Sequence, residues 1–234
     1  MIELLKKELQ DLADDEQAKN LQRFFKTGKG EYGEGDIFLG IKVPVQRDIA
    51  KKYSGLSLPK IQELLKSKIH EHRLTGLIIL SNKYKESKEE EKANIFNFYL
   101  KNTKNINNWD LVDVTAPNIV GHFLFDKKKN ILYDLARSAD LWERRIAIVS
   151  TFDFIKKQEF QETLALSEIL LDDKHDLIHK AVGWMLREVG KKDKVVLENF
   201  LKQHYKIMPR TMLRYAIEHF PEEKRKMYLL GELK

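Results

Sequence analysis

Trp109 and Asp113 are the residues of this sequence whose types and spacing most clearly suggest chemistry. They lie four residues apart, so in a helix both side chains project from the same face. A carboxylate beside an indole can stabilise positive charge, since the carboxylate is negative and the ring face attracts cations. Taken singly, each residue has a simpler interpretation: Trp109 as a core residue and Asp113 as an exposed helix carboxylate.

Two further side chains could act with this pair. Arg145 offers five donors in a fixed geometry that suits a phosphate group. Trp184 offers a flat apolar face on which a sugar or a base can pack. These residues are far apart in the chain, so any shared site requires a fold that brings distant helices side by side.

An internal repeat predicts such a fold. Four segments begin at positions that are separated by 36, 35 and 36 residues, namely Arg73, Trp109, Arg144 and Lys180. A period of this length is typical of helix-pair solenoids, in which equivalent helices stack and line one concave surface. One helical turn later in each segment stand Leu77, Asp113, Ile148 and Trp184. The repeat therefore predicts that both tryptophans, the carboxylate and several cations share one groove.

Hydrophobic periodicity is helical almost throughout the chain, and the alternation typical of strands is hard to find. Partner helices of the repeat are predicted near residues 89–100, 125–137, 160–171 and 193–204. With one more pair at each end, we expect an all-α protein, a right-handed α-solenoid of about six helical pairs. Residues 1–234 are expected to form a single domain.

Composition limits the classes of function. The chain has 234 residues, a formal net charge of +6 and no cysteine, which excludes disulfide frameworks, thiolate zinc sites and cysteine nucleophiles. The amino terminus lacks the apolar core of a secretory signal, and no apolar run approaches the roughly 18 residues of a membrane span. The positive excess suggests an anionic partner, but by itself it is better explained by a solvated lysine surface.

Two weaker signals have competing interpretations. Gly28, Gly30, Gly33 and Gly35 mark a loop, but no Gly-Lys-Ser/Thr follows as in a phosphate-binding loop, so we expect an arm beside the groove. His175 and His179 are four apart near acidic residues, a spacing that could hold a metal ion. The same segment also fits an acidic helix start, which is the interpretation we favour.

Several passages together resemble the AlkD-like family of DNA alkylation repair glycosylases, which are built from HEAT-like helical repeats. The resemblance covers nearly the whole length and rests on Phe24–Gly28, Phe38–Pro44, Asn108–Asp113, Trp142–Ala147 and Lys180–Glu188. Asn108 and the pair Asp176–Leu177 stand where a characterised member carries aromatic residues. The resemblance implies HEAT-like pairs with a concave DNA-binding groove.

The resemblance also implies an activity, the removal of 7-methylguanine and 3-methyladenine from duplex DNA at the start of base excision repair. It assigns the catalytic aspartate to Asp113, the groove tryptophans to Trp109 and Trp184, and the groove arginine to Arg145. Expected DNA contacts are Lys42, Arg47, Arg144, Lys180 and Arg187. We expect a monomeric, cytoplasmic enzyme that reaches the nucleoid through DNA and needs no metal or cofactor.

Two other functions stay open at this stage. A HEAT-like protein can bind DNA by shape and charge without catalysis, and an ordinary solenoid can bind a peptide or a partner helix in its concave surface. Neither alternative requires the full set of Trp109, Asp113, Arg145 and Trp184.

Overall fold

The computed structural model describes residues 1–232, which fold into helices joined by short turns. Within this range no β-strand forms, and an isolated parallel bridge pairs Ile37 with Ile69. The all-α prediction is therefore confirmed. The chain divides into two compact units, Met1–Thr115 and Ala116–Lys234. The single domain and the solenoid formed by all helical pairs together stay predictions.

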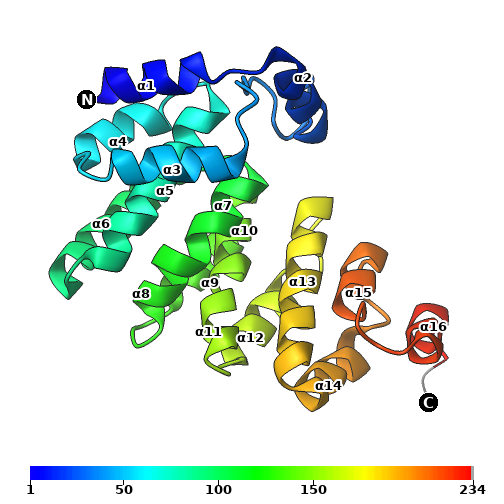
Figure 1. Ribbon diagram of the computed structural model, residues 1–234. Helices are drawn as coiled ribbons and strands as arrows, with labels where there is room; N and C mark the ends of the chain where they lie inside the picture. The colour runs from blue at the N-terminus through cyan, green and yellow to red at the C-terminus, as the bar shows by residue number, and fades with distance from the viewer. Residues whose placement is uncertain (233–234) are drawn as a thin grey trace. The chain divides into compact units, whose positions relative to one another are not determined.

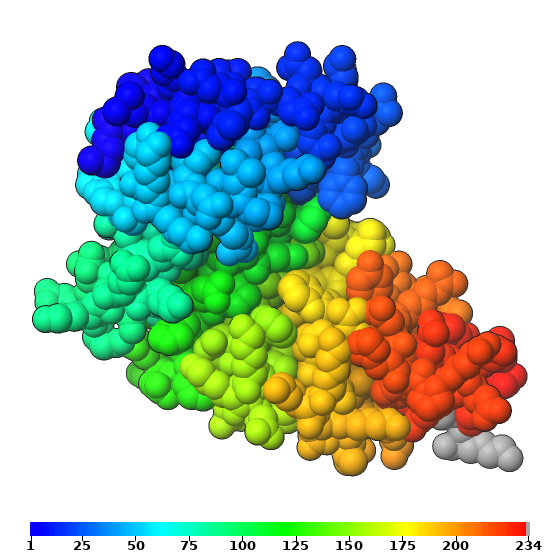
Figure 2. Space-filling view, in the orientation of Figure 1, coloured from blue at the N-terminus to red at the C-terminus, as the bar shows by residue number. Residues whose placement is uncertain are grey.

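The first unit is organised around one long helix, α5. Its helices are α1 (Ile2–Asp11), α2 (Asp15–Phe24), α3 (Val43–Lys52), α4 (Leu58–Leu65), α5 (His70–Glu86), α6 (Glu89–Lys101) and α7 (Trp109–Ala116). Helices α1, α3, α4 and α6 pack against α5, whose first eleven residues are all buried (Figure 1). On the face drawn in Figure 2, side chains of α1 and α3 form much of the surface of this unit.

The second unit is organised around α13. Its helical segments are a π-helical stretch (Pro117–Gly121), α8 (His122–Leu124), α9 (Asn130–Ala136), α10 (Leu141–Ser150), α11 (Phe152–Lys156), α12 (Gln161–Ile169), α13 (Asp176–Lys192), α14 (Lys194–His204), α15 (Arg210–Ala216) and α16 (Glu222–Leu230). Helices α10, α14 and α15 pack against α13 (Figure 1). None of the helices in the described part of the chain is long and apolar enough to cross a membrane.

Glycines within the repeat allow the helices of each unit to approach closely. A Cβ atom on Gly76 of α5 would lie 3.1 Å from Leu64 Cβ of α4. On Gly183 of α13, a Cβ would lie 2.5 Å from the carbonyl oxygen of Met212 in α15, closer than real Cβ atoms come. Both glycines fall three residues after the repeat positions Arg73 and Lys180. In these two repeats, glycine at this position therefore permits close helix packing.

Three of the four predicted partner helices are confirmed, as α6, α12 and α14. The helix predicted over 125–137 is wrong in its first part, because only Asn130–Ala136 is helical there. The preceding turn is closed by a bond of 3.0 Å from the Lys127 N–H to the Leu124 carbonyl. In this turn Lys127 lies over the ring of Phe123, and Lys129 lies over the ring of Phe154.

Candidate active site

Helix α7 carries both Trp109 and Asp113. Trp109 is its first residue and Asp113 lies one turn further on, and both side chains are half-buried. The indole stacks on Phe25, with ring centroids 5.1 Å apart and planes inclined by 16°. Phe24, the last residue of α2, meets the same indole edge-on at 5.8 Å. The Trp109 ring thus packs against the end of α2, and these two aromatic contacts hold one side of the ring.

The carboxyl-terminal end of α7 is held by Tyr99 of α6. The Thr115 hydroxyl donates to the Leu111 carbonyl at 2.6 Å, so the Tyr99 hydroxyl donates to Thr115 Oγ1 at 2.9 Å. Burial raises the pKa of Tyr99 above its usual value, and the charge of Asp113 raises it further. Tyr99 therefore stays neutral beside Asp113, and its bond anchors the turn that carries this carboxylate.

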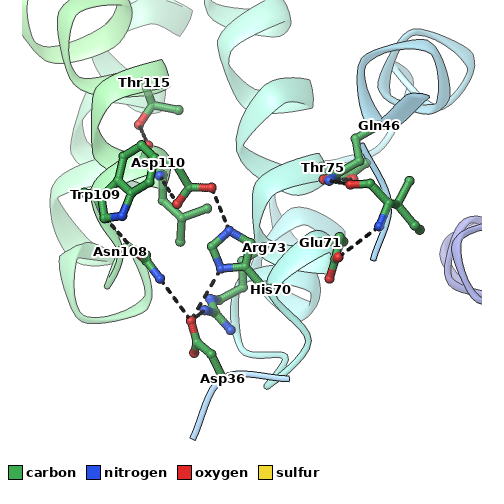
Figure 3. A network of polar contacts seen from close by, with 12 residues as sticks. Asp36, Gln46, His70, Glu71, Arg73, Thr75, Asn108, Trp109, Asp110 and Thr115 are labelled. Atoms are coloured by element: carbon green, nitrogen blue, oxygen red, sulfur yellow. Dashed lines mark hydrogen bonds and ion pairs between the residues drawn. The ribbon is translucent and has the colours of Figure 1, made fainter. Parts of the chain in front are cut away.

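A buried network of charged and polar side chains holds the amino-terminal end of α7 (Figure 3). Asp36 Oδ2 accepts hydrogen bonds from Arg73 Nη2 at 2.7 Å and from Asn108 Nδ2 at 3.4 Å. His70 Nε2 donates to Asp110 Oδ2 at 2.8 Å, and His70 Nδ1 lies 3.4 Å from Asp36 Oδ2. The loop, α5 and α7 thus meet at a cluster with two carboxylates and two cations.

The charge of this cluster is balanced because His70 is protonated. Burial by itself lowers the pKa of His70, but the negative charge of Asp110 and the bonds to Asp110 and Asp36 outweigh it and raise the pKa to about 9. Burial also acts to raise the pKa of Asp36, yet its bond to His70 and the positive charge of Arg73 hold that pKa below the usual range. Both ion pairs are therefore formed at neutral pH.

Outside this cluster, the buried carboxylate of Glu71 binds the backbone of the segment that precedes α3. It accepts backbone N–H bonds from Leu39 at 2.9 Å, Gly40 at 2.9 Å and Ile41 at 3.3 Å. This segment belongs to Phe38–Pro44, one of the passages in which the sequence resembles the AlkD-like family. Gly40 has a φ of 87°, and its α-carbon packs directly against the first turn of α2. Phe38–Pro44 therefore packs against the start of α2, the helix whose last residue, Phe24, contacts the Trp109 ring.

The second unit holds the other two candidate residues. Trp184 on α13 is half-buried, with its ring centroid 5.7 Å from that of Phe152. Arg145 on α10 is only 5% exposed, and its Nη1 donates to the Leu177 carbonyl in the first turn of α13 at 2.7 Å. Arg145 thus links α10 to the helix that bears Trp184.

The basic side chains that are expected to contact DNA differ in whether an acidic side chain of the protein already pairs with them. Lys42 and Arg47 are exposed and form no ion pair within the described residues. Arg144 Nε pairs with Asp173 at 2.6 Å, and Arg187 pairs with Glu188 and Glu218. Lys180 pairs with Asp176 at 2.7 Å on the surface.

The pair His175 and His179 belongs to a helix start. His175 Nδ1 accepts the Leu177 N–H at 3.1 Å and caps α13, while His179 Nε2 donates to the Asp173 carbonyl at 2.5 Å. Burial lowers the pKa of His175, which keeps this nitrogen available as an acceptor. Across the residues that the structure describes, no group of three or more His, Asp or Glu is arranged to hold a metal ion.

The family model described as "DNA alkylation repair enzyme" matches residues 5–220 of the chain. The chain belongs to the DNA alkylation repair enzyme family. Its fold is similar to that of a predicted DNA alkylation repair enzyme from Enterococcus faecalis, with a TM-score of 0.71, 15% identity, and coverage of 90% of this chain and 97% of the other. It is also similar to AlkD2 from Streptococcus mutans, with a TM-score of 0.57, 16% identity, and coverage of 88% and 98%. No curated protein matches the sequence.

In this member of the DNA alkylation repair family, each unit brings together part of the predicted site. Trp109 and Asp113 share one face of α7, and Arg145 contacts the first turn of the Trp184 helix. The meeting of these two halves in one groove stays a prediction. Asp36, His70 and Glu71 were not predicted from the sequence. Their signal was weak, because no local pattern points to their partners, which lie at least 30 positions away in the chain.

Proposed function

We propose that this protein is a DNA glycosylase that hydrolyses the N-glycosidic bond of cationic alkylated purines in duplex DNA. The substrates would be 7-methylguanine and 3-methyladenine, and the reaction would start base excision repair. One observation carries the proposal: a chain of the DNA alkylation repair family holds an indole and a carboxylate one turn apart on a helix that is anchored at both ends. The protein would act as a monomer in the cytoplasm, on nucleoid DNA.

The chemistry needs few catalytic groups. A purine methylated at N7 or N3 already carries a positive charge, so the departing base needs no proton from a general acid. The remaining demand is to stabilise the oxocarbenium-like sugar and to direct a water to it. An ionised Asp113 does both, as a negative charge and as a base. The proposal requires neither a metal nor a cofactor.

The other proposed residues prepare the DNA for this step. Trp109 and Trp184 would present ring faces to the sugar and the cationic base, where their quadrupoles favour positive charge. Arg145 would contact a phosphate near the lesion through its guanidinium group, whose planar donors suit a phosphate. Contacts along the DNA backbone would come from Lys42, Arg47, Arg144, Lys180 and Arg187. The lesion would stay stacked in the duplex, so bulky adducts would be tolerated.

A base-release assay tests the proposal. The protein is incubated with duplex DNA that contains one 7-methylguanine, and free base is measured against spontaneous loss from the same DNA alone. We expect release by the wild type, little release from an equivalent duplex with neutral uracil, and the loss of most activity in Asp113→Asn. Asp11→Asn, at an exposed aspartate of α1, is the matched control and should retain full activity.

The same assay separates the alternatives. Equal release by Asp113→Asn and the wild type would refute the role of Asp113. Binding to duplex DNA without base release by the wild type would favour the catalytically silent DNA-binding protein. If the wild type does not bind duplex DNA even at low salt, the protein-binding solenoid becomes the better explanation.

A further inference from the structure

Asn108 lies at the point where the charged network reaches Trp109. Its side chain is completely buried, although asparagine is usually exposed. Its Nδ2 donates to Asp36 Oδ2 at 3.4 Å, and its Oδ1 accepts the backbone N–H of Trp109 at 2.8 Å. The Asn108 amide thus connects the first residue of α7 to Asp36, which lies 72 residues before Asn108 in the chain.

The residue on the other side of Trp109 is held as well. Asp110 accepts from His70 Nε2 at 2.8 Å, and His70 itself is only 2% exposed. Trp109 therefore stands between two residues, Asn108 and Asp110, that are both bonded to buried groups outside α7 (Figure 3). The backbone that carries the indole has little freedom to turn.

One end of the glycine-rich loop contacts Trp109 directly, and the other end reaches it through Asn108. Phe25, just before the loop, stacks on the indole, and Asp36, just after it, bonds to Asn108. The loop is closed on itself, since the Gly33 N–H donates to the Lys26 carbonyl at 3.0 Å. A Cβ on Gly33 would lie 2.5 Å from the Phe25 carbonyl oxygen, so glycine is needed for this approach. The spacing of Phe25 and Asp36 is thus set by the loop itself.

We propose that Asn108 is a positioning residue for Trp109: held by Asp36 at the end of the glycine-rich loop, it sets the direction of the indole toward the substrate. The consequence for catalysis rests on the proposed glycosylase function, while the positioning itself does not. Asn108 touches no substrate and acts through Trp109. Small displacements of such groups are costly, because a shift of about 1 Å in a reacting arrangement can lower rates about 100-fold.

Asn108→Ala is the most informative variant. It removes both amide bonds but leaves Asp36 paired with Arg73 and His70, so the buried charges stay balanced. Asn108→Ser restores a short acceptor for the Trp109 N–H, as serine does at many helix starts. Asn107→Ala is the matched control, since the buried Oδ1 of Asn107 has no hydrogen-bond partner among the residues that the structure describes.

Two readouts separate positioning from stability and from function. The first is the indole N–H signal of Trp109 in a ¹⁵N–¹H NMR spectrum, assigned with Trp109→Phe. We expect it to shift or broaden in Asn108→Ala, to move back in Asn108→Ser, and to stay unchanged in Asn107→Ala. The second is the single-turnover rate of 7-methylguanine release at saturating protein, measured with the Kd for the same duplex. We expect the rate to fall about 10- to 100-fold in Asn108→Ala, with little change in Kd.

Each outcome decides a distinct point. An unchanged Trp109 signal in Asn108→Ala overturns the positioning role, whatever the enzyme does. A shifted signal with a wild-type release rate overturns its catalytic consequence. Absence of release by the wild type overturns the proposed function, and the NMR signal still decides whether Asn108 orients Trp109.

Discussion

His70 and Asp110 form an ion pair of 2.8 Å, between Nε2 and Oδ2, although 40 residues separate them in the chain. His70 opens α5 and Asp110 lies in the first turn of α7, so the pair joins the starts of two repeat helices. It is almost entirely sheltered from water, with side-chain exposures of 2% and 14%. This contact fixes the helix that carries Trp109 and Asp113.

The stability of the protein should therefore depend on pH in the alkaline range. The pKa of His70 is raised in the folded protein from 6.5 to about 9. A raised pKa contributes stability that is complete below the unfolded value and is lost as the pH rises through the folded value. We expect the free energy of unfolding in urea to fall between about pH 7 and about pH 10, with His70 contributing on the order of 3 kcal/mol.

His70→Gln is the control for this effect, because lysines and tyrosines titrate in both proteins. The groups that face His70 are Asp36 from the loop, Asp110 from α7 and Arg73 on its own helix. His70→Gln should be less stable at neutral pH and should lose less stability on the alkaline side. Parallel pH curves for the two proteins would show that His70 does not hold its proton in the folded state.

Gly40 and Gly35 should differ strongly in their tolerance of alanine. Both have positive φ, 87° and 85°, so alanine strains either backbone by about 1 kcal/mol. A Cβ at Gly40 would also lie 2.2 Å from the Asp14 carbonyl oxygen, whereas a Cβ at Gly35 would have no atom of residues 1–232 within 4 Å apart from those of Gly35 and its chain neighbours. We expect Gly40→Ala to lower the free energy of unfolding by about 3 kcal/mol or more, and Gly35→Ala by about 1 kcal/mol. If urea denaturation shows equal losses of unfolding free energy in Gly40→Ala and Gly35→Ala, the close packing of Gly40 against the start of α2 is contradicted.

Arg47 and Arg187 should contribute differently to the salt dependence of DNA binding. Arg47 is exposed, while Arg187 is already paired with Glu188 and Glu218. A cation that is free before binding releases about one counterion when it meets a phosphate. We expect Arg47→Gln to reduce the slope of log Kd against log salt by about one and Arg187→Gln to reduce it by clearly less. A larger reduction of the slope in Arg187→Gln than in Arg47→Gln would show that Arg187 leaves Glu188 and Glu218 when DNA binds.

Arg145 offers a test of the proposed phosphate contact within the second unit. Arg145→Ala should weaken binding to duplex DNA and reduce the salt slope by about one. The variant also loses the bond to the Leu177 carbonyl, so thermal unfolding must be measured in parallel. A lower Tm with an unchanged slope would mean that Arg145 only joins α10 to α13.

The helical class of this protein could be predicted from its sequence, because a period of 3.6 in apolar residues is a local property of each segment. The repeat spacing of about 36 residues placed Arg73, Trp109, Arg144 and Lys180 near the starts of helices. It could not place the turn before Asn130, since a lysine-rich stretch fits a helix or a turn equally well. The pairing of Trp109 with Asp113 on one face likewise needed nothing beyond their spacing.

Only the tertiary structure decided how that face is held. Asp36, His70 and Asn108 form one buried cluster, but they are separated by 34 and 38 residues and no local pattern connects them. Their burial depends on charge balance, which exists only when all the partners meet, because an unpaired charge is too costly to remove from water. The sequence therefore specified which residues could do chemistry, and the folded chain decided which others hold them in place.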